Sequence, residues 1–311
     1  MTKIAHFFYN DYGRRFCDYV PKSIEFIDNT CDEDVDLIYC GTTSRLADAV
    51  HAKMKFKKPL VCWVWDIPYN WKEWAMAPEE QSFNSPNDHR NLLSIIDALK
   101  QCDLVISASK YTQKVLLEEF QVASEQTYFY VDLDLDLTPP PKSSEKRIVQ
   151  VSRMVPHKRF EISIDAVQSL KTPLTCIGMS KNELYFQKLQ VRAKRNVTFL
   201  HNISRDRVIA ELSKATVLVS PSIFEGWGLS PIEAIACGTP VILNDMPVFR
   251  EVYGDAAIYH NPDDVNDLRQ KLTMVLSDES LQKKIVDDCR QIIAPFTPEL
   301  FAERWMKLLS L

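Results

Sequence analysis

Glycine is scarce in this sequence: the chain has 311 residues, and only 7 of them are glycine. An average protein contains about 7% glycine. The shortage excludes a collagen-like chain and a protein built on repeated glycine-rich loops. The few glycines that are present therefore stand where the backbone needs a conformation, or a close approach, that other residues do not allow.

Long apolar runs are also missing. No stretch of about 18 apolar residues occurs, so no transmembrane helix is expected. The N-terminal residues lack the apolar core of a secretory signal. The 8 cysteines include no Cys-x-x-Cys pair, which favours reduced, buried thiols over a disulfide framework or a zinc site. We expect a cytoplasmic protein, and a peripheral contact with a membrane face stays open.

The chain has no excess of basic residues, since 37 Lys and Arg stand against 42 Asp and Glu. Proteins that bind nucleic acid usually carry a basic face, so nucleic acid is not expected as a partner. Hydrophobic residues make up 46% of the chain and charged residues 25%, which is usual for globular domains with packed cores. The length favours two domains.

Strand-like and helix-like patterns alternate along the chain, which is typical of parallel sheets with crossover helices. A proline-rich stretch around residue 140 interrupts the alternation and predicts a linker. We therefore expect an α/β protein with two Rossmann-like domains, residues 1–141 and 142–295, facing a cleft. The predicted strands are Ile4–Phe8, Val35–Cys40, Leu60–Trp65, Leu104–Ser107, Thr127–Val131, Arg147–Ser152, Leu174–Gly178, Val197–Leu200, Val217–Ser220, Pro240–Leu243 and Ala257–Tyr259.

The densest motif lies between a predicted strand and a predicted helix, where Gly226 and Gly228 follow Glu225. Glycines there let backbone N–H groups approach a ligand. Ser230 is predicted to cap the helix, with Glu233 completing a Ser-x-x-Glu capping box. A glycine loop that leads into a helix N-terminus favours an anion such as phosphate. Spacing alone leaves two alternatives open. Glu233 could serve only as the capping-box partner, and Glu225 could be a solvated turn residue.

The whole string Glu-Gly-Trp-Gly-Leu-Ser-Pro-Ile-Glu-Ala resembles the donor-site signature of glycosyltransferase family 4, which comprises retaining enzymes of the GT-B fold. The family pattern Glu-x7-Glu is met by Glu225 and Glu233. A second block resembles the family's Arg-x4-Lys segment, with Arg153 and Lys158 at its two positions. Two fixed cations of this kind can stabilise a leaving diphosphate. The compact size also resembles members encoded by large DNA viruses.

The resemblance implies roles for individual residues. Arg153 and Lys158 would contact the donor diphosphate, and Glu225 would bind hydroxyls of the transferred sugar. Glu233 would bind the ribose, and the final helix, in residues 296–311, would cross back onto the first domain. The remaining donor contacts implied by the resemblance are Met179 and Asn202 near the base and the backbone of Gly226, Trp227, Gly228, Leu229 and Ser230 at the phosphates.

The N-terminal half departs from the family pattern. Many members carry a Gly-Gly loop after the first strand, whereas this chain has the single Gly13 followed by Arg14 and Arg15, which we expect to supply phosphate contacts in its place. Trp65 stands where the histidine of a His-Asp pair is expected and Asp66 keeps the place of the aspartate, so we expect Asp66 to be the acceptor-orienting carboxylate. Trp63 and Trp65 share strand parity and point to one face, with one expected in the core and the other at a cleft wall.

The resemblance implies a metal-independent, retaining hexosyltransferase with no cofactor. The donor is GDP-mannose or UDP-glucose, and the acceptor is a glycan or a lipid-linked molecule. The alternative is a catalytically idle nucleotide-sugar-binding subunit that supports a partner transferase. A monomer or a homodimer is expected. The Asp-x-Asp repeats within residues 132–136, which resemble a metal-binding motif, are assigned to solvated linker charge.

Overall fold

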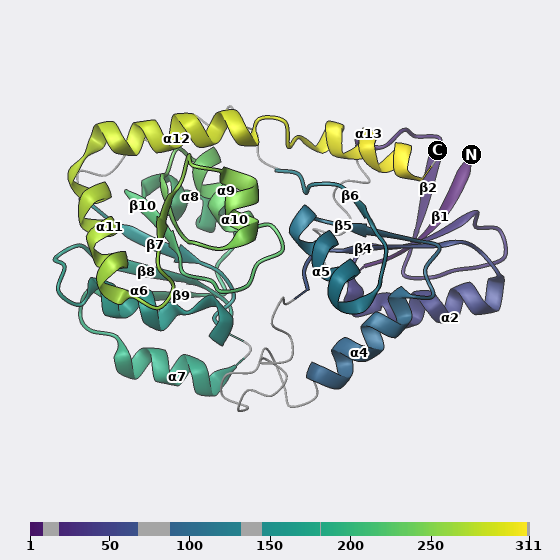
Figure 1. The fold of residues 1–311 in the computed structure, drawn as a ribbon, viewed down its shortest axis with the longest axis horizontal. Coiled ribbons are helices and arrows are strands. Elements are labelled where there is room, and N and C mark those ends of the chain that lie inside the picture. Colours follow the sequence, from purple (N-terminus) through teal and green to yellow (C-terminus); the bar gives the residue numbers. More distant parts are fainter. Residues whose placement is uncertain (9–18, 68–87, 132–144, 181, 310–311) are drawn as a thin grey trace. The chain divides into compact units, whose positions relative to one another are not determined.

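The computed structural model describes residues 1–8, 19–67, 88–131, 145–180 and 182–309 (Figure 1). Contacts divide the chain into two compact units. The first unit contains the described residues of Met1–Lys72, Asn87–Asp132 and Pro295–Leu311, and the second those of Leu133–Ala294. The boundary predicted between residues 141 and 142 lies outside the described residues.

The first unit is a parallel sheet with helices packed against it. Its strands follow the order β2-β1-β3-β4-β5-β6, with every pairing parallel. The strands are β1 (Thr2–Phe7), β2 (Ile24–Asp28), β3 (Leu37–Cys40), β4 (Leu60–Val64), β5 (Leu104–Ser107) and β6 (Glu125–Gln126), and the helices are η2 (Thr43–Arg45), α2 (Leu46–Phe56), α4 (Asp88–Leu99), α5 (Lys110–Phe120) and α13 (Pro298–Leu308).

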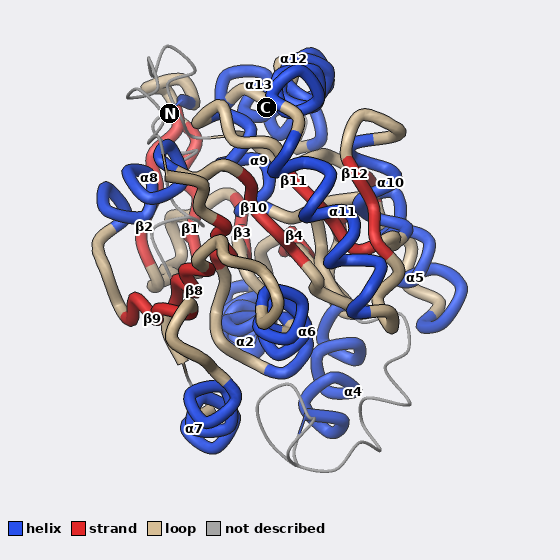
Figure 2. Tube along the Cα trace, turned by 90° about the vertical axis from the view of Figure 1, so that its left-hand side faces the viewer, coloured by secondary structure: helices blue, strands red, loops and turns tan. Residues whose placement is uncertain are grey.

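The two faces of this sheet bury different sets of side chains, because neighbouring residues of a strand point to opposite faces. Ile38, Cys40 and Cys62 belong to the apolar core that also contains Leu46 and Ala49 of α2. Figure 2 shows the strands in red with helices in blue beside them. The opposite face, which carries Tyr39 and Trp63, receives another helix.

That helix is α13, the last one of the chain. Its Trp305 is fully buried and meets Tyr39 edge-on, with ring centroids 5.2 Å apart. Phe301 lies 4.8 Å from the Trp63 ring, measured between centroids. The Val131 N–H donates to the Phe296 carbonyl over 2.8 Å. These contacts place the C-terminal helix in the first unit, although the chain passes through the second unit before reaching it.

The second unit repeats the design with a sheet in the order β12-β11-β10-β7-β8-β9, again with parallel pairings. In Figure 1 the long helix α12 runs along one side of this sheet, and α7 lies on the other. The strands are β7 (Ile148–Val151), β8 (Leu174–Gly178), β9 (Val197–His201), β10 (Val217–Ser220), β11 (Val241–Asn244) and β12 (Ile258–His260), and the helices are η3 (Pro156–Lys158), α6 (Phe160–Val167), α7 (Glu183–Arg192), α8 (Arg205–Lys214), α9 (Leu229–Ala236), α10 (Pro247–Tyr253), α11 (Val265–Ser277) and α12 (Glu279–Ile293).

Two sequence-based assignments in the first unit differ from the structure. The strand predicted over Thr127–Val131 is wrong, because the ladder ends at Gln126 and the following backbone turns to the segment before α13. Strand β2 was not predicted, since it is a partly exposed edge strand whose apolar alternation is short. Trp63 and Trp65 do share a face, with ring centroids 5.7 Å apart, and Trp63 is fully buried.

Candidate functional site

The second sheet has a topological switch point between β7 and β10. Chain connections lead from β7 to β8 on one side, whereas β10, three strands later in sequence, pairs with β7 on the other side. In open α/β sheets, ligands bind beyond the carboxyl ends of the strands at such a point. The segment with Arg153 and Lys158 follows β7, and the segment with Glu225 follows β10. The topology therefore brings both motifs to one place.

The segment after β7 holds Lys158 firmly. Lys158 ends the short helix η3 and is 7% exposed. Its backbone carbonyl accepts a hydrogen bond of 2.7 Å from the side-chain amide of buried Gln150 on β7, and its N–H donates to the Val155 carbonyl. Arg153, at the start of the segment, is exposed. One cation is thus fixed and shielded, and the other reaches into solvent.

Lys158 contacts the segment after β10. Its Nζ lies 2.6 Å from Glu225 Oε1 and donates to the Phe224 carbonyl over 3.3 Å. The Ile223 N–H donates to the His157 carbonyl, which ties the two segments together through the backbone as well. The structure therefore brings together two predicted site residues that are far apart in sequence.

His157 was not predicted as part of this site, because a lone histidine beside a lysine has no distinctive pattern. It is 2% exposed, and its ring lies 5.7 Å from that of Phe224, between centroids. Burial lowers the pKa of His157 well below its usual value, and the positive charges of Lys158 and Arg153 lower it further. The imidazole is therefore neutral at physiological pH, which avoids a third positive charge beside Lys158 and Arg153.

The glycine loop enters α9 differently from the capping-box prediction. The N-cap is Gly228, in the left-handed region with φ +87°, and the helix begins at Leu229 with no side-chain cap. The prediction that Ser230 is the N-cap is wrong, because Gly228 lets the backbone turn into the helix two residues earlier. The backbone N–H groups of the first turn still face outward from the helix start, where an anion is favoured.

Gly228 is required for packing as well as for conformation. A Cβ atom at this position would lie 2.5 Å from Phe249 Cε1 of α10, and Phe249 is fully buried. Gly226 and Trp227 are also buried, whereas Leu229 and Ser230 are half-buried. The backbone predicted to bind phosphate is therefore packed inside the second unit, against α10, and is not an exposed loop.

Glu233 does not close a capping box. Its side chain is 9% exposed, and its Oε1 lies 2.7 Å from Nη1 of Arg205, the first residue of α8. Arg205 was not predicted as a site residue, because its partner lies 28 positions away in sequence. Because α9 begins at Leu229 with Gly228 as its N-cap, Glu233 is not the partner of a Ser230 N-cap, and its carboxylate pairs with Arg205.

The residues predicted to hold the base follow β8 and β9. Gly178, which ends β8, comes so close to β7 that a Cβ atom would lie 1.7 Å from the Ser152 carbonyl oxygen. Met179 is 45% exposed, and its carbonyl accepts from the Met154 N–H. Asn202 has a left-handed backbone, with φ +52°, and donates its N–H to the Gly178 carbonyl. These turns adjoin the segment of Arg153.

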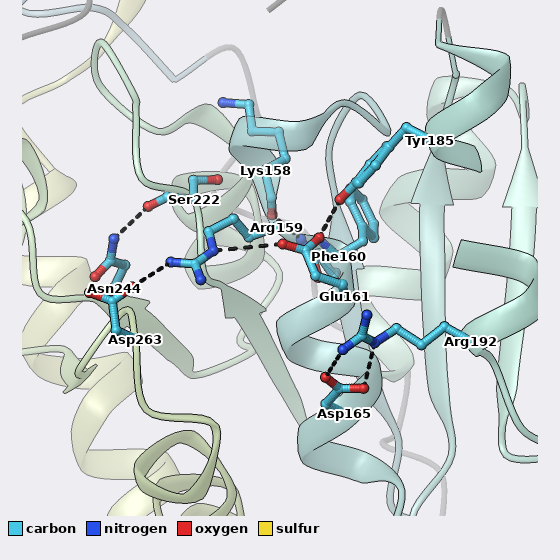
Figure 3. A network of polar contacts seen from close by, with 11 residues as sticks. Lys158, Arg159, Phe160, Glu161, Asp165, Tyr185, Arg192, Ser222, Asn244 and Asp263 are labelled. Atoms are coloured by element: carbon cyan, nitrogen blue, oxygen red, sulfur yellow. Dashed lines mark hydrogen bonds and ion pairs between the residues drawn. The ribbon is translucent and has the colours of Figure 1, made fainter. Parts of the chain in front are cut away.

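A polar network holds the backbone that directly follows Lys158 (Figure 3). Arg159, with φ +49°, has its Nη1 3.1 Å from Asp263 and its Nε 3.7 Å from Glu161. The Glu161 carboxylate accepts from the Tyr185 hydroxyl over 2.6 Å. In Figure 3 Lys158 points away from this network, which leaves its ammonium to Glu225. The network thus anchors the backbone of this segment without engaging the Lys158 ammonium.

The predicted site residues of the N-terminal half belong to the first unit. Asp66 is exposed, two residues beyond the end of β4. Trp65 is half-buried and meets Phe129 edge-on at 5.2 Å between centroids, so it serves in packing. Gly13 and Arg14 lie outside the described residues, as does the Asp-x-Asp segment of residues 132–136. Asp66, Gly13 and Arg14 therefore stay predictions.

Within the described part of the chain, no group of three or more His, Cys, Asp or Glu side chains is arranged to hold a metal ion. None of the described helices combines the length and apolarity needed to span a membrane.

Known proteins resemble this chain in sequence. Residues 138–291 match the family model of group 1 glycosyl transferases. The O-antigen chain mannosyltransferase RfbU of Salmonella typhimurium is 34% identical over 173 residues, which cover 54% of this chain and 49% of the relative. The serotype-specific mannosyltransferase WbdA of Escherichia coli is 21% identical over 232 residues, which cover 67% of this chain and 28% of the relative. This chain spans about half or less of the length of these curated relatives.

Solved structures show the same fold. HepE of Anabaena, crystallised with UDP and glucose, superposes with a TM-score of 0.77 and 17% identity, with full coverage of both chains. Sucrose-phosphate synthase of Thermosynechococcus elongatus has a TM-score of 0.81 and 18% identity, covering 100% of this chain and 98% of the other. At these identities the likeness establishes the fold, which is GT-B with two Rossmann-like domains.

Proposed function

We propose that this chain, a glycosyltransferase family 4-like protein, transfers mannose from a nucleoside diphosphate donor to a glycan or a lipid-linked acceptor, with retention of configuration and without a metal ion. The observation that carries the proposal is the shielded Lys158–Glu225 pair at the switch point of the second sheet. GDP-mannose is the favoured donor, because two of the similar curated proteins are named as mannosyltransferases.

The arrangement in the second unit supports this chemistry. Lys158 supplies a fixed positive charge in contact with the segment that leads into α9, and the exposed Arg153 supplies a second charge. Both stabilise negative charge that develops on a leaving diphosphate. The donor phosphate then helps to deprotonate the acceptor hydroxyl on the same face, so no protein nucleophile is needed. Glu225, held by Lys158, accepts hydrogen bonds from hydroxyls of the transferred sugar.

Donor binding is tested with a thermal-shift screen of the purified chain against GDP-mannose, UDP-glucose, GDP and UDP. A ligand at about 100 times its dissociation constant adds about 2.7 kcal/mol to the free energy of unfolding. Stabilisation by GDP-mannose supports the proposed donor, whereas stabilisation by UDP-glucose alone replaces mannose by glucose. An absence of any shift with all four compounds contradicts a nucleotide-sugar site.

The reaction itself is tested with GDP-mannose and simple mannoside acceptors in the presence of a chelator. We expect transfer without added metal, and a product whose anomeric configuration, followed by NMR, equals that of the donor. An inverted product contradicts the proposed mechanism. Binding without either transfer or donor hydrolysis favours the idle donor-binding subunit, an alternative motivated by Trp65, which packs against Phe129 where the family pattern has a histidine.

A further inference from the structure

The ion pair between Arg205 and Glu233 joins two segments of the donor site that the sequence treats separately. Arg205 opens α8, directly after the turn that contains Asn202, and Glu233 lies in the second turn of α9. The distance from Arg205 Nη1 to Glu233 Oε1 is 2.7 Å. One pair thus connects the turn assigned to the base with the carboxylate assigned to the ribose.

Arg205 is held in place by its own helix start. Ser204 is the N-cap of α8, and its hydroxyl oxygen accepts from the Arg207 N–H. The guanidinium of Arg205 has five N–H donors in a planar fork, which fixes the orientation of a bound carboxylate. The Arg205 side chain is 31% exposed, whereas that of Glu233 is 9% exposed. The arginine therefore approaches a mostly buried carboxylate from the side that solvent reaches.

A carboxylate in this position needs a partner for two reasons. Burial of an unpaired carboxylate is costly, because its charge loses hydration. A donor diphosphate at the start of α9 would also repel it. A nearby guanidinium offsets both effects. A carboxylate accepts through two oxygens, so one ion pair leaves it able to accept hydrogen bonds from neutral hydroxyl groups as well.

We infer that Arg205 is a positioning residue for donor recognition: it neutralises and orients Glu233 so that the carboxylate accepts from the ribose hydroxyls of the nucleotide. The inference rests on the proposed function. It adds that the preference for ribose over deoxyribose depends on an arginine that need not touch the ribose itself.

The test compares binding of GDP and UDP with binding of their 2′,3′-dideoxy forms, measured by titration calorimetry. The wild type should prefer the ribose forms by about 10- to 100-fold, the range for hydrogen bonds to a charged group. Arg205→Ala should weaken binding of the ribose forms by about 10-fold or more and change binding of the dideoxy forms by less than about 3-fold. Arg205→Lys, which keeps the charge but loses the fork, should fall between them.

The matched control is Arg207→Ala. Arg207 lies on the same helix and pairs with Glu211 one turn along that helix, so the variant removes the same charge from outside the site. It should leave both affinities and the ribose preference unchanged. Thermal unfolding of each variant shows whether it is folded, and Arg205→Gln replaces Arg205→Ala if the latter is not.

Each result decides the matter. Loss of the ribose preference in Arg205→Ala, with dideoxy binding kept, supports the inference. Equal weakening of both nucleotide forms shows that Arg205 only attracts the diphosphate, and an unchanged preference shows that Glu233 does not depend on it; both overturn the inference. A wild type that binds nucleotide without preferring ribose overturns the inference alone, whereas a wild type that binds no nucleotide overturns the proposed function too.

Discussion

Lys158 and Glu225 form a shielded ion pair, with Nζ and Oε1 2.6 Å apart and side-chain exposures of 9% and 16%. Removal of one member of a shielded pair leaves the other charge without compensation, which is more costly than loss of a surface pair. In the proposed reaction, the same lysine stabilises the leaving diphosphate. Its two roles can be separated by measuring stability and turnover on the same variants.

Lys158→Ala should lower turnover by about 100-fold or more, since it removes a fixed charge from the transition state. Donor transfer assays at saturating GDP-mannose measure the effect. Lys171→Ala is the control, because Lys171 is an exposed lysine of the same unit. It should keep wild-type turnover. Near wild-type activity in Lys158→Ala would remove Lys158 from the mechanism.

Gly228→Ala should destabilise the second unit by about 1–3 kcal/mol, through backbone strain at positive φ together with a clash against buried Phe249. Gly254→Ala is the comparison variant. Gly254 also has a positive φ, of +52°, although its ψ of −125° differs from the +69° of Gly228, and a Cβ there meets nothing within 4 Å. Urea unfolding should therefore show a larger loss for Gly228→Ala. Equal losses would show that conformation alone, and not the contact with Phe249, requires glycine in the donor loop.

Trp305→Ala should destabilise the first unit by about 3–5 kcal/mol, because it empties a fully buried site of α13 beside Tyr39. Leu300→Ala serves as the comparison on the same helix, since Leu300 is 38% exposed, and it should cost much less. Hydrogen exchange of the β3 amides reports on the unit directly. Wild-type protection of β3 in Trp305→Ala would show that α13 contributes little to the stability of this sheet.

Stability should decrease as the pH falls below about 6.5, the usual pKa of an unfolded histidine. Burial first, and then the charges of Lys158 and Arg153, lower the pKa of folded His157 well below that value. The unfolded chain therefore takes up a proton that the folded chain does not, and the free energy of unfolding falls by up to about 1.4 kcal/mol per pH unit for this group. Urea unfolding from about pH 7.5 to about pH 5 measures the slope.

A second buried histidine contributes with the same sign. Burial also lowers the pKa of His260. His157→Gln should therefore remove part of the slope, and the double variant with His260→Gln should remove more. The slope is compared rather than the absolute stability, so a general loss from the substitution does not obscure the result. An unchanged slope in His157→Gln would contradict a neutral, buried imidazole at this position.

Much of the fold follows from local patterns. Short apolar runs placed the strands of the second unit within a few residues, for example β8 at Leu174–Gly178 and β10 at Val217–Ser220. These features depend on neighbouring residues, so they are visible in the sequence. Edge strand β2 and the segment Thr127–Val131 were misjudged, because their structure depends on which distant backbone offers hydrogen bonds.

The sequence by itself determined the α/β class with two Rossmann-like domains, because alternating strand and helix patterns are local features. It also marked Arg153, Lys158, Glu225 and Glu233 as candidate site residues through their resemblance to family motifs, and their roles stay predictions. Only the tertiary structure decided the partners of those side chains. Lys158 meets the backbone of Phe224 across 66 positions, and Arg205 meets Glu233 across 28. No short-range pattern encodes such contacts. The first arises where the parallel strands β7 and β10 lie side by side and bring the loops after them together, and the second where α8 packs against α9.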